Sequence, residues 1–204
     1  MIIQRNKYFL FDDCGAHAAV GKSCMLLRFM GKKFRPELDP TISIDADQRI
    51  VSIHDKPTKF QIWDMDGDES RRSFTRALYR GAAAAILVYD ITSRETFDHI
   101  GRWLKEAEEL APPNLTIILV GNKCDLSHER AVSYEEGQEF AEKHGLIFME
   151  SSAKNNQNVE EVTCTVRSSL ETKRPHHVVM QAFFTAATTV SKKSEDGVLH
   201  PSAE

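Results

Sequence analysis

Residues 82–125 decide the fold, and they read AAAAILVYDITSRETFDHIGRWLKEAEELAPPNLTIILVGNKCD. Apolar runs at 85–90 and 116–121 have the composition of buried strands. Between them, apolar residues recur every three or four positions along a helix predicted to start near Ser93, and Pro112-Pro113 stops it. A strand, a helix and a strand in this order are typical of a parallel sheet covered by helices, so we predict an α/β fold. The apolar positions of the helix are Phe97, Ile100, Leu104, Ala107 and Ala111.

The same alternation continues on both sides of this stretch. Turn-forming residues at 54–57 (HDKP) predict an antiparallel hairpin between the second and third strands. A second helix is predicted from Ser133, where Glu136 is placed for a capping box, to His144, and Gly145 ends it. The remaining strands are predicted at 8–11, 48–53, 59–64 and 147–150.

The composition is that of an ordinary globular protein. Of the 204 residues, 41% are hydrophobic and 27% are charged, and the formal net charge is -4. This charge provides no general attraction to nucleic acid or to an anionic membrane. The longest apolar run, 82–89, is far shorter than the roughly 20 residues of a membrane-spanning helix, and residues 1–7 lack the apolar core of a secretion signal. Four scattered cysteines fit reduced thiols, so we expect a cytoplasmic protein.

Part of a phosphate-binding motif follows the first strand. Gly21, Lys22 and Ser23 open a helical stretch. Backbone N–H groups at a helix N-terminus cradle phosphates, while the lysine reaches the terminal phosphates and the serine binds Mg²⁺. The full motif, G-x-x-x-x-G-K-[ST], has its first glycine at position 16, but Ala16 stands there and Gly15 lies one residue too early. The tripeptide alone is therefore a weak signal.

A strand end carries a possible magnesium ligand. Asp64 ends a predicted strand, where its carboxylate would hold Mg²⁺ through water. The N–H group of Gly67, shortly after it, would meet a γ-phosphate. Taken alone, a strand-ending turn is the better explanation of these two residues.

Two tetrapeptides follow the last two predicted strands, Asn122-Lys123-Cys124-Asp125 and Ser151-Ser152-Ala153-Lys154. The carboxylate of Asp125 can accept hydrogen bonds from both the ring N–H and the amino group of guanine, a pair that adenine does not offer. Asn122 would tie the loops together, Lys123 would lie along the base, and N–H groups near Ala153 would meet the guanine oxygen. Each tetrapeptide is common alone, but both together, downstream of Gly21, predict a guanine-nucleotide site.

The chain resembles Rab small GTPases of the Ras superfamily over most of residues 7–161. The segments that carry the resemblance are 63–64 (WD), 79–83 (YRGAA), 87–92 (LVYDIT) and 122–126 (NKCDL), while 94–97 (RETF) and 145–150 (GLIFME) resemble the Rab-B branch. The resemblance implies a P-loop small-GTPase fold, whose mainly parallel sheet of about six strands is flanked by about five helices.

The resemblance also implies GTP or GDP and Mg²⁺ as ligands. The implied nucleotide contacts are Gly21, Lys22, Ser23, Cys24, Thr41, Gly67, Asn122, Lys123, Asp125, Ser152, Ala153 and Lys154, and the implied Mg²⁺ contacts are Ser23, Thr41 and Asp64.

Several positions depart from the Rab pattern. Ala16, Ala18 and Ala19 stand where glycine or a small polar residue is usual, and their methyl groups crowd the phosphates. Asp68 stands at the position of the catalytic glutamine that orients the attacking water. A carboxylate lacks the paired donor and acceptor of an amide, and its charge opposes the γ-phosphate. We therefore expect reduced triphosphate affinity and weak or lost GTP hydrolysis.

The resemblance also bears on partners and location. It implies a monomer in vesicle-mediated protein transport between endoplasmic reticulum and Golgi, with a guanine nucleotide and no nucleic acid as ligand. Binding to Rab exchange factors and effectors is expected to be weakened, because Ala46 and Leu78 replace two of three aromatic residues that effectors contact. Rabs end in prenylated cysteines, whereas residues 199–204 read LHPSAE, so no stable lipid anchor is expected.

The sequence predicts three segments of the chain and leaves three hypotheses for its function. Residues 1–161 are predicted to form the GTPase domain, 162–181 a loop insertion because no single period fits them, and 182–204 the rest of the last helix and a flexible tail. The favoured hypothesis is a guanine-nucleotide switch with feeble hydrolysis. The alternatives are a nucleotide-free pseudo-GTPase that acts as a protein-interaction module, and a divergent product that folds poorly.

Overall fold

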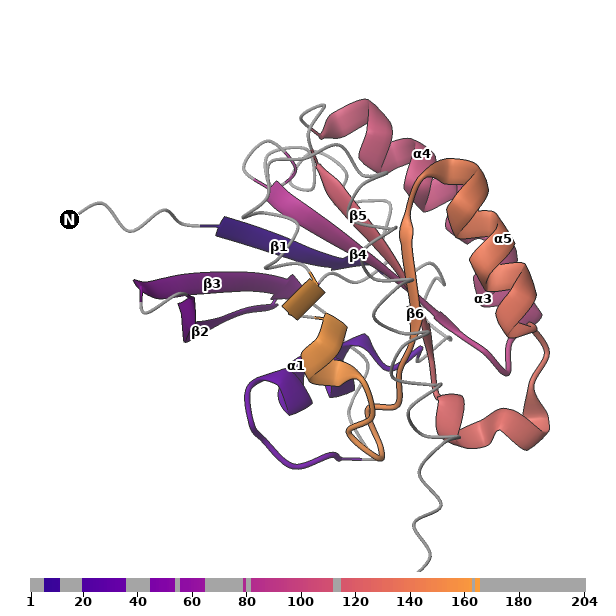
Figure 1. Ribbon diagram of the computed structural model, residues 1–204, viewed down its shortest axis with the longest axis horizontal. Coiled ribbons are helices and arrows are strands. Elements are labelled where there is room, and N and C mark those ends of the chain that lie inside the picture. The colour runs from indigo at the N-terminus through magenta and orange to yellow at the C-terminus, as the bar shows by residue number, and fades with distance from the viewer. Residues whose placement is uncertain are drawn as a thin grey trace, which may run out of the picture.

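One sheet with helices on both faces organises the chain (Figure 1). β2 runs antiparallel to β3, and every other neighbouring pair runs parallel. The predicted α/β fold is therefore confirmed. The computed structural model describes residues 6–11, 20–35, 45–53, 56–64, 79, 82–111, 115–162 and 164–165. The strands are β1 (Asn6–Phe11), β2 (Asp45–Ile53), β3 (Lys56–Asp64), β4 (Ala82–Asp90), β5 (Thr116–Asn122) and β6 (Ile147–Glu150), in the order β2-β3-β1-β4-β5-β6.

The hairpin between β2 and β3 is tighter than predicted. Ile53 pairs with Lys56, and Ser52 pairs with Pro57, so Lys56 and Pro57 belong to β3 rather than to the turn. Proline is tolerated there because β3 pairs with β1 only from Phe60 onward, which leaves Pro57 with one described neighbouring strand. β2 and β4 also begin earlier than predicted, at Asp45 and Ala82, because pairing within the sheet overrides the weak strand propensity of their first residues.

The helix predicted between β4 and β5 is divided in two. α3 (Arg94–Asp98) and α4 (Ile100–Leu110) are separated at His99. At this junction the Arg102 N–H donates to the His99 carbonyl three residues earlier, a tighter bond than the regular helical one. The prediction of one continuous helix was therefore wrong at His99, although its apolar face does bury Ile100, Leu104 and Ala107.

The second predicted helix, α5 (Tyr134–His144), is confirmed in its bounds and its caps. Ser133 Oγ accepts from the Glu136 N–H, and the Glu136 carboxylate accepts from the Ser133 N–H, which forms a complete capping box. Gly145 ends the helix with a left-handed φ of 66°. A glycine at this position adopts that conformation without steric cost.

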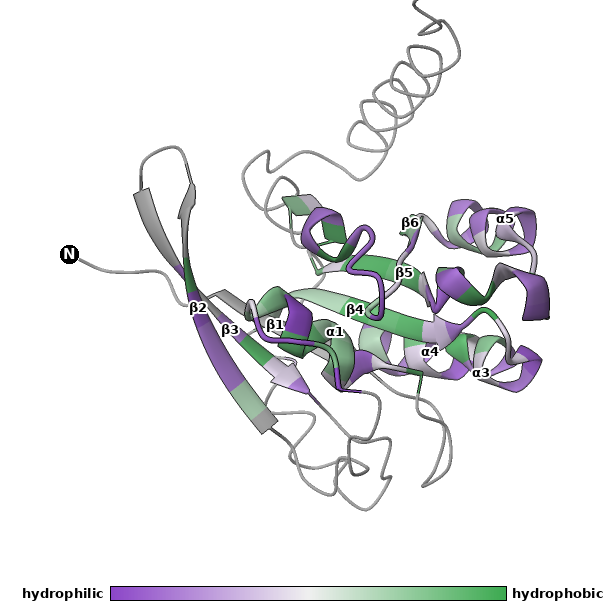
Figure 2. Cartoon of the chain, turned by 90° about the horizontal axis from the view of Figure 1, so that it is seen from below, coloured by the Kyte–Doolittle hydropathy of each residue, from purple (hydrophilic) through white to green (hydrophobic). Residues whose placement is uncertain are grey.

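The core is divided by the sheet into two clusters. On one face, α3, α4 and α5 cover Leu87, Tyr89 and Leu119; on the other, α1 (Lys22–Phe29) covers Val88 and Val120. Figure 2 shows β4 and β5 as hydrophobic over most of their length, whereas β2 is largely hydrophilic. Central parallel strands are apolar on both faces because helices bury both. No helix among the described residues has the length and apolarity to cross a membrane.

The C-terminal end of the described chain is helical at 159–162 and 164–165. Val162 was predicted to begin a loop, but it lies in this helix and is 2% exposed, because it packs against the cluster under α1. Cys164 and Thr165 are helical as well, so the loop predicted for 162–181 is wrong at its described residues. Residues 163 and 166–204 lie outside the described residues. The domain boundaries as such stay a prediction.

Candidate functional site

The predicted site residues gather at the carboxyl ends of the strands. Asp64 ends β3, Asn122 ends β5, and Glu150 ends β6, while α1 begins beside them at Lys22. Ligands of open parallel sheets bind at this edge, where loops from separate strands meet. The structure therefore brings together most of the site residues that it describes.

Gly21 precedes α1 and has a φ of 93°, a left-handed conformation that favours glycine. A Cβ atom added at Gly21 would overlap the Asn122 Nδ2 atom. The Gly21 carbonyl accepts the first helical bond of α1, from the Met25 N–H. Lys22 and Ser23 thus stand in the first turn of a helix, whose N-terminal N–H groups favour anions such as phosphate.

Asn122 joins three segments from the interior of the site. Its side chain is buried, and Nδ2 donates to the Val20 carbonyl at 2.7 Å. Its Oδ1 atom accepts from Ser151 Oγ at 3.2 Å and from the Ala153 N–H at 3.3 Å. The residue thus links the start of α1 to the loop after β6. Of the N–H groups near Ala153 that were predicted to meet the guanine oxygen, that of Ala153 itself donates to Asn122.

Asp125 is held by the loop after β6. Its Oδ1 atom accepts from Ser152 Oγ at 2.5 Å, and its Oδ2 atom lies 3.9 Å from Lys154 Nζ. Ser152 Oγ also accepts from the Asn155 N–H at 3.0 Å. Asp125 lies in η2 (Cys124–Glu129), the 3₁₀-helix that follows β5, and its side chain is only 8% exposed. The carboxylate is therefore oriented by a hydroxyl group that is itself held by a backbone N–H group.

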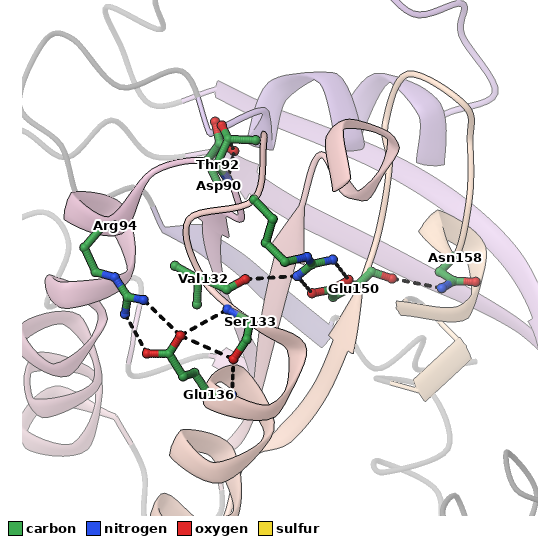
Figure 3. Close-up of polar contacts among 9 residues, drawn as sticks. Asp90, Thr92, Arg94, Val132, Ser133, Glu136, Glu150 and Asn158 are labelled. Atoms are coloured by element: carbon green, nitrogen blue, oxygen red, sulfur yellow. Dashed lines mark hydrogen bonds and ion pairs between the residues drawn. The ribbon is translucent and has the colours of Figure 1, made fainter. Parts of the chain in front are cut away.

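Lys123 forms an ion pair with an aspartate that was not predicted as a site residue. Its Nζ atom lies 2.6 Å from Asp90 Oδ2, and its backbone has a left-handed φ of 66°. The other oxygen of Asp90 accepts from the N–H and hydroxyl groups of Thr92 at 2.8 and 2.7 Å, and Figure 3 places the two side chains together. Asp90 ends β4, so this ion pair links two neighbouring strand ends.

Ser23 and Asp64 provide a set of oxygen donors suited to Mg²⁺. Ser23 Oγ donates to Asp64 Oδ2 at 2.5 Å, and the Asp64 carboxylate is 2% exposed. Mg²⁺ prefers oxygen ligands, and it commonly binds one or two protein oxygens together with substrate phosphates and water. The two side chains fit that role. No group of three or more His, Cys, Asp or Glu residues suited to a metal exists among the described residues.

Cys24 follows Ser23 in α1 and is half-buried. Burial raises the pKa of its thiol, the positive charge of Lys123 opposes that rise, and the charge of Asp64 adds to it. Burial also raises the pKa of Cys124. Both thiols are therefore protonated at neutral pH and are weak nucleophiles.

Arg28, like Asp90, was not predicted to belong to the site. Arg28, in the last turn of α1, donates from Nε to the Ala153 carbonyl and from Nη2 to the Lys154 carbonyl, both at 2.8 Å. Its guanidinium lies 6.0 Å from the centre of the Phe34 ring. These contacts join positions more than a hundred residues apart, so no local pattern in the sequence signals them.

Two Arg–Glu ion pairs lie beside the site: one joins η2 to the end of β6, and the other joins α3 to the start of α5 (Figure 3). Arg130 forms a two-bond ion pair with Glu150, at 2.5 and 2.8 Å, and also donates to the Val132 carbonyl. Arg94 forms a second two-bond pair with Glu136. Such planar pairs fix orientation as well as charge. The loops after β5 and β6 are thus held in place from outside the site.

Several predicted site residues lie outside the described residues. They are Ala16, Ala18, Ala19, Thr41, Gly67, Asp68 and Leu78. Ala46 is described, is exposed, and pairs across the hairpin with Trp63.

The comparison with protein families identifies one family. The model described as the Ras family matches residues 15–172. This range includes every predicted nucleotide and Mg²⁺ contact, whether or not the structure describes it.

Proposed function

Because the chain belongs to the Ras family of small GTP-binding proteins, we propose that it is a guanine-nucleotide switch, and from its resemblance in sequence we propose further that it is of the Rab type with weak or lost GTP hydrolysis. The observation that carries the proposal is the arrangement of Asp125, Ser152 and Asn122 at the ends of β5 and β6. The alternatives of a nucleotide-free module and of a poorly folding product are tested by the same experiments.

Base recognition rests on the orientation of the Asp125 carboxylate. Two adjacent donors, the ring N–H and the amino group of guanine, match the two oxygens of one carboxylate. Because Ser152 Oγ bonds Oδ1, the carboxylate has a defined orientation before any base arrives. A base that lacks either donor forgoes one hydrogen bond to a mostly buried, charged carboxylate, which costs binding free energy.

Phosphate recognition rests on the start of α1. Lys22 supplies a positive charge, and the N–H groups of the first turn supply donors. Ser23 and Asp64 would hold Mg²⁺, which, when bound, neutralises phosphate charge. Because Asn122 bonds the Val20 carbonyl just before Gly21, the position of the phosphate end is tied to that of the base end. The site therefore suits one extended ligand with a guanine at one end and phosphates at the other.

Weak hydrolysis is proposed from the sequence of the segment after β3. Asp68 stands at the position where the family has a glutamine that orients the attacking water. A carboxylate cannot offer that water the paired donor and acceptor of an amide, and its negative charge opposes the γ-phosphate. The alanines at 16, 18 and 19 would further weaken triphosphate binding, since each adds a methyl group where the backbone approaches phosphate.

The Rab assignment, transport between endoplasmic reticulum and Golgi, and a cytoplasmic location are proposed from the resemblance in sequence. The segment 87–92 (LVYDIT) supports the assignment, since its Asp90 and Thr92 belong to the site that holds Lys123. Exposed Ala46 beside Trp63 supports weakened binding of effectors that read aromatic residues. Imaging of a fluorescent fusion against markers of the two compartments tests the location.

The decisive experiment is a titration of the full chain with fluorescent GDP and GTP, with and without Mg²⁺. ATP serves as competitor, and Asp125→Ala serves as the control variant. We expect binding that ATP does not compete and that the variant loses by about 10²-fold or more, since the charged acceptor of two hydrogen bonds is removed. Absence of binding to folded protein at micromolar nucleotide would favour the nucleotide-free module, and absence of a cooperative unfolding transition would favour the poorly folding product.

A further inference from the structure

Arg28 connects the phosphate end of the site to the loop after β6. It lies in α1, the helix whose first turn contains Lys22 and Ser23. Its guanidinium donates to two successive carbonyl groups of the loop, those of Ala153 and Lys154. A planar guanidinium presents its N–H groups in a fixed fork, so two bonds at 2.8 Å fix the orientation of the peptides that carry these carbonyls.

The effect of Arg28 reaches Asp125 through one peptide and one hydroxyl group. In a trans peptide the C=O and N–H groups point in opposite directions, and the described chain has no cis peptide. Holding the Lys154 carbonyl toward Arg28 therefore turns the Asn155 N–H to the other side, where it donates to Ser152 Oγ. Ser152 Oγ in turn donates to Asp125 Oδ1.

We propose that Arg28 is a positioning residue for guanine recognition: it holds the peptide after Lys154 so that Ser152 orients the Asp125 carboxylate. The proposal rests on the proposed function, since it assigns a role within the same site. Arg28 does not touch the base in this account. It acts on specificity through Ser152, and it makes the base-binding loop depend on the helix that binds the phosphates.

The test compares GDP with inosine diphosphate, which has the ring N–H but lacks the amino group of guanine. The ratio of their dissociation constants measures how well Asp125 is oriented toward that amino group. We expect Arg28→Gln to lower this ratio by about three- to tenfold, the range of one ordinary hydrogen bond. We expect Arg28→Lys, which keeps the charge and can donate to one carbonyl, to recover part of the ratio. A residue that only stabilises the fold would weaken both ligands alike.

Arg49 provides the matched control. It lies on β2, donates to the carbonyl of Phe29, the neighbour of Arg28, and packs over the Phe29 ring at 4.8 Å. Arg49 also lies 3.9 Å from Glu160, in the helical turn that follows the loop after β6, in an ion pair whose Glu160 side chain is 72% exposed. Arg49→Gln therefore perturbs the same end of α1 without removing a contact to the loop residues Ala153 and Lys154. We expect its ratio of GDP to inosine diphosphate affinity to equal that of the unmodified protein.

The possible results distinguish failure of the proposed function from failure of the role of Arg28 alone. If the unmodified protein does not distinguish the two diphosphates, the proposed function fails, and this inference fails with it. If it does distinguish them, an unchanged ratio in Arg28→Gln, or an equal fall in Arg49→Gln, overturns the role of Arg28 alone. Thermal unfolding of each variant is measured first, and Arg28→Lys carries the test if Arg28→Gln does not fold.

Discussion

At Gly21, one added methyl group would disturb the whole site. The residue needs its left-handed φ of 93°, and a Cβ atom would overlap the amide of Asn122. Asn122 cannot move away cheaply, because the same side chain bonds the Val20 carbonyl, Ser151 Oγ and the Ala153 N–H. A displacement at the phosphate end therefore reaches the loop that would hold the base.

We expect Gly21→Ala to lower the free energy of unfolding by about 2–4 kcal/mol, from left-handed strain plus the overlap. GDP affinity should fall by at least about tenfold, since Asn122 is displaced. Urea unfolding and GDP titration measure the two effects. Gly31→Ala is the control, because Gly31 also has a positive φ, 75°, but a Cβ atom there meets nothing within 4 Å. Gly21→Ala that binds GDP as well as Gly31→Ala would contradict this explanation.

The residue at position 68 is expected to limit hydrolysis. Asp68→Gln restores an amide that can both donate to and accept from the attacking water, and it removes a negative charge. We expect the single-turnover rate of GTP hydrolysis to rise by up to about a hundredfold, a size typical of restored positioning. Asp68→Asn removes the charge without restoring the reach of the longer side chain. An equal rise in both variants would assign the defect to charge alone.

At the scale of elements, the start of α5 is tied to α3 by charge. Arg94, the first residue of α3, forms two bonds to Glu136 in the capping box of α5 and one to the Ala131 carbonyl. The hydrogen bonds from Arg94, and then that from the Ser133 N–H, lower the pKa of Glu136 from 4.5 to about 2. One side chain thus caps its own helix and links it to its neighbour.

The lowered pKa of Glu136 makes the stability of the protein fall as the pH is lowered. Because the pKa of Glu136 is lowered by folding, its contribution to stability is full above about pH 4.5 and is lost as the pH falls toward 2. We expect Arg94→Gln to raise the Glu136 pKa toward 4.5 and to flatten the fall in stability over that window. Urea unfolding between pH 7 and 3, with an NMR titration of the Glu136 carboxyl, measures both effects.

Lys105→Gln is the control for this pair. Lys105 forms an exposed ion pair within α4, 4.0 Å from Glu109. Exposed ion pairs of this kind contribute little to the free energy of unfolding. The dependence of stability on pH in Lys105→Gln should therefore match that of the unmodified protein. A profile of Arg94→Gln that also matches would show that the Arg94 pair does not stabilise the protein in solution.

At the scale of the whole molecule, binding of a nucleotide is expected to increase the free energy of unfolding. The site joins α1, the ends of β3, β4 and β5, and the loop after β6, so a ligand that spans it stabilises elements on both faces of the sheet. A ligand that binds only the folded chain at a hundred times its dissociation constant adds ~2.7 kcal/mol.

We therefore expect GDP with Mg²⁺ to raise the unfolding temperature as its concentration increases. Removal of Mg²⁺ with EDTA should reverse part of this rise, since Ser23 and Asp64 would lose the ion. Differential scanning calorimetry measures the shift, and ADP at equal concentration is the control for general effects of phosphate. An equal rise with ADP would contradict recognition of the base by Asp125.

Much of the fold could be predicted from local pattern. The capping box at Ser133 and Glu136 and the stop at Gly145 were correctly located, because caps depend on residues a few positions apart. The break at His99 and the strand positions of Lys56 and Pro57 were missed, because they depend on how neighbouring strands and helices pack. The order of the parallel strands is likewise a property of the folded sheet.

Of the site residues, too, some could be predicted from short motifs and others could not. Gly21, Lys22, Ser23, Asn122 and Asp125 were predicted from sequence, because the chemistry of phosphate and guanine restricts residue types within short motifs, and their roles toward a nucleotide stay predictions. Arg28 and Asp90 were found only in the structure, where they contact Ala153 and Lys123. Their partners lie far along the chain, and the contact of a helix arginine or a strand-end aspartate with such a partner leaves no local pattern in the sequence. Folding of the chain around the sheet brings these distant residues together, and this decided how the site is held in place.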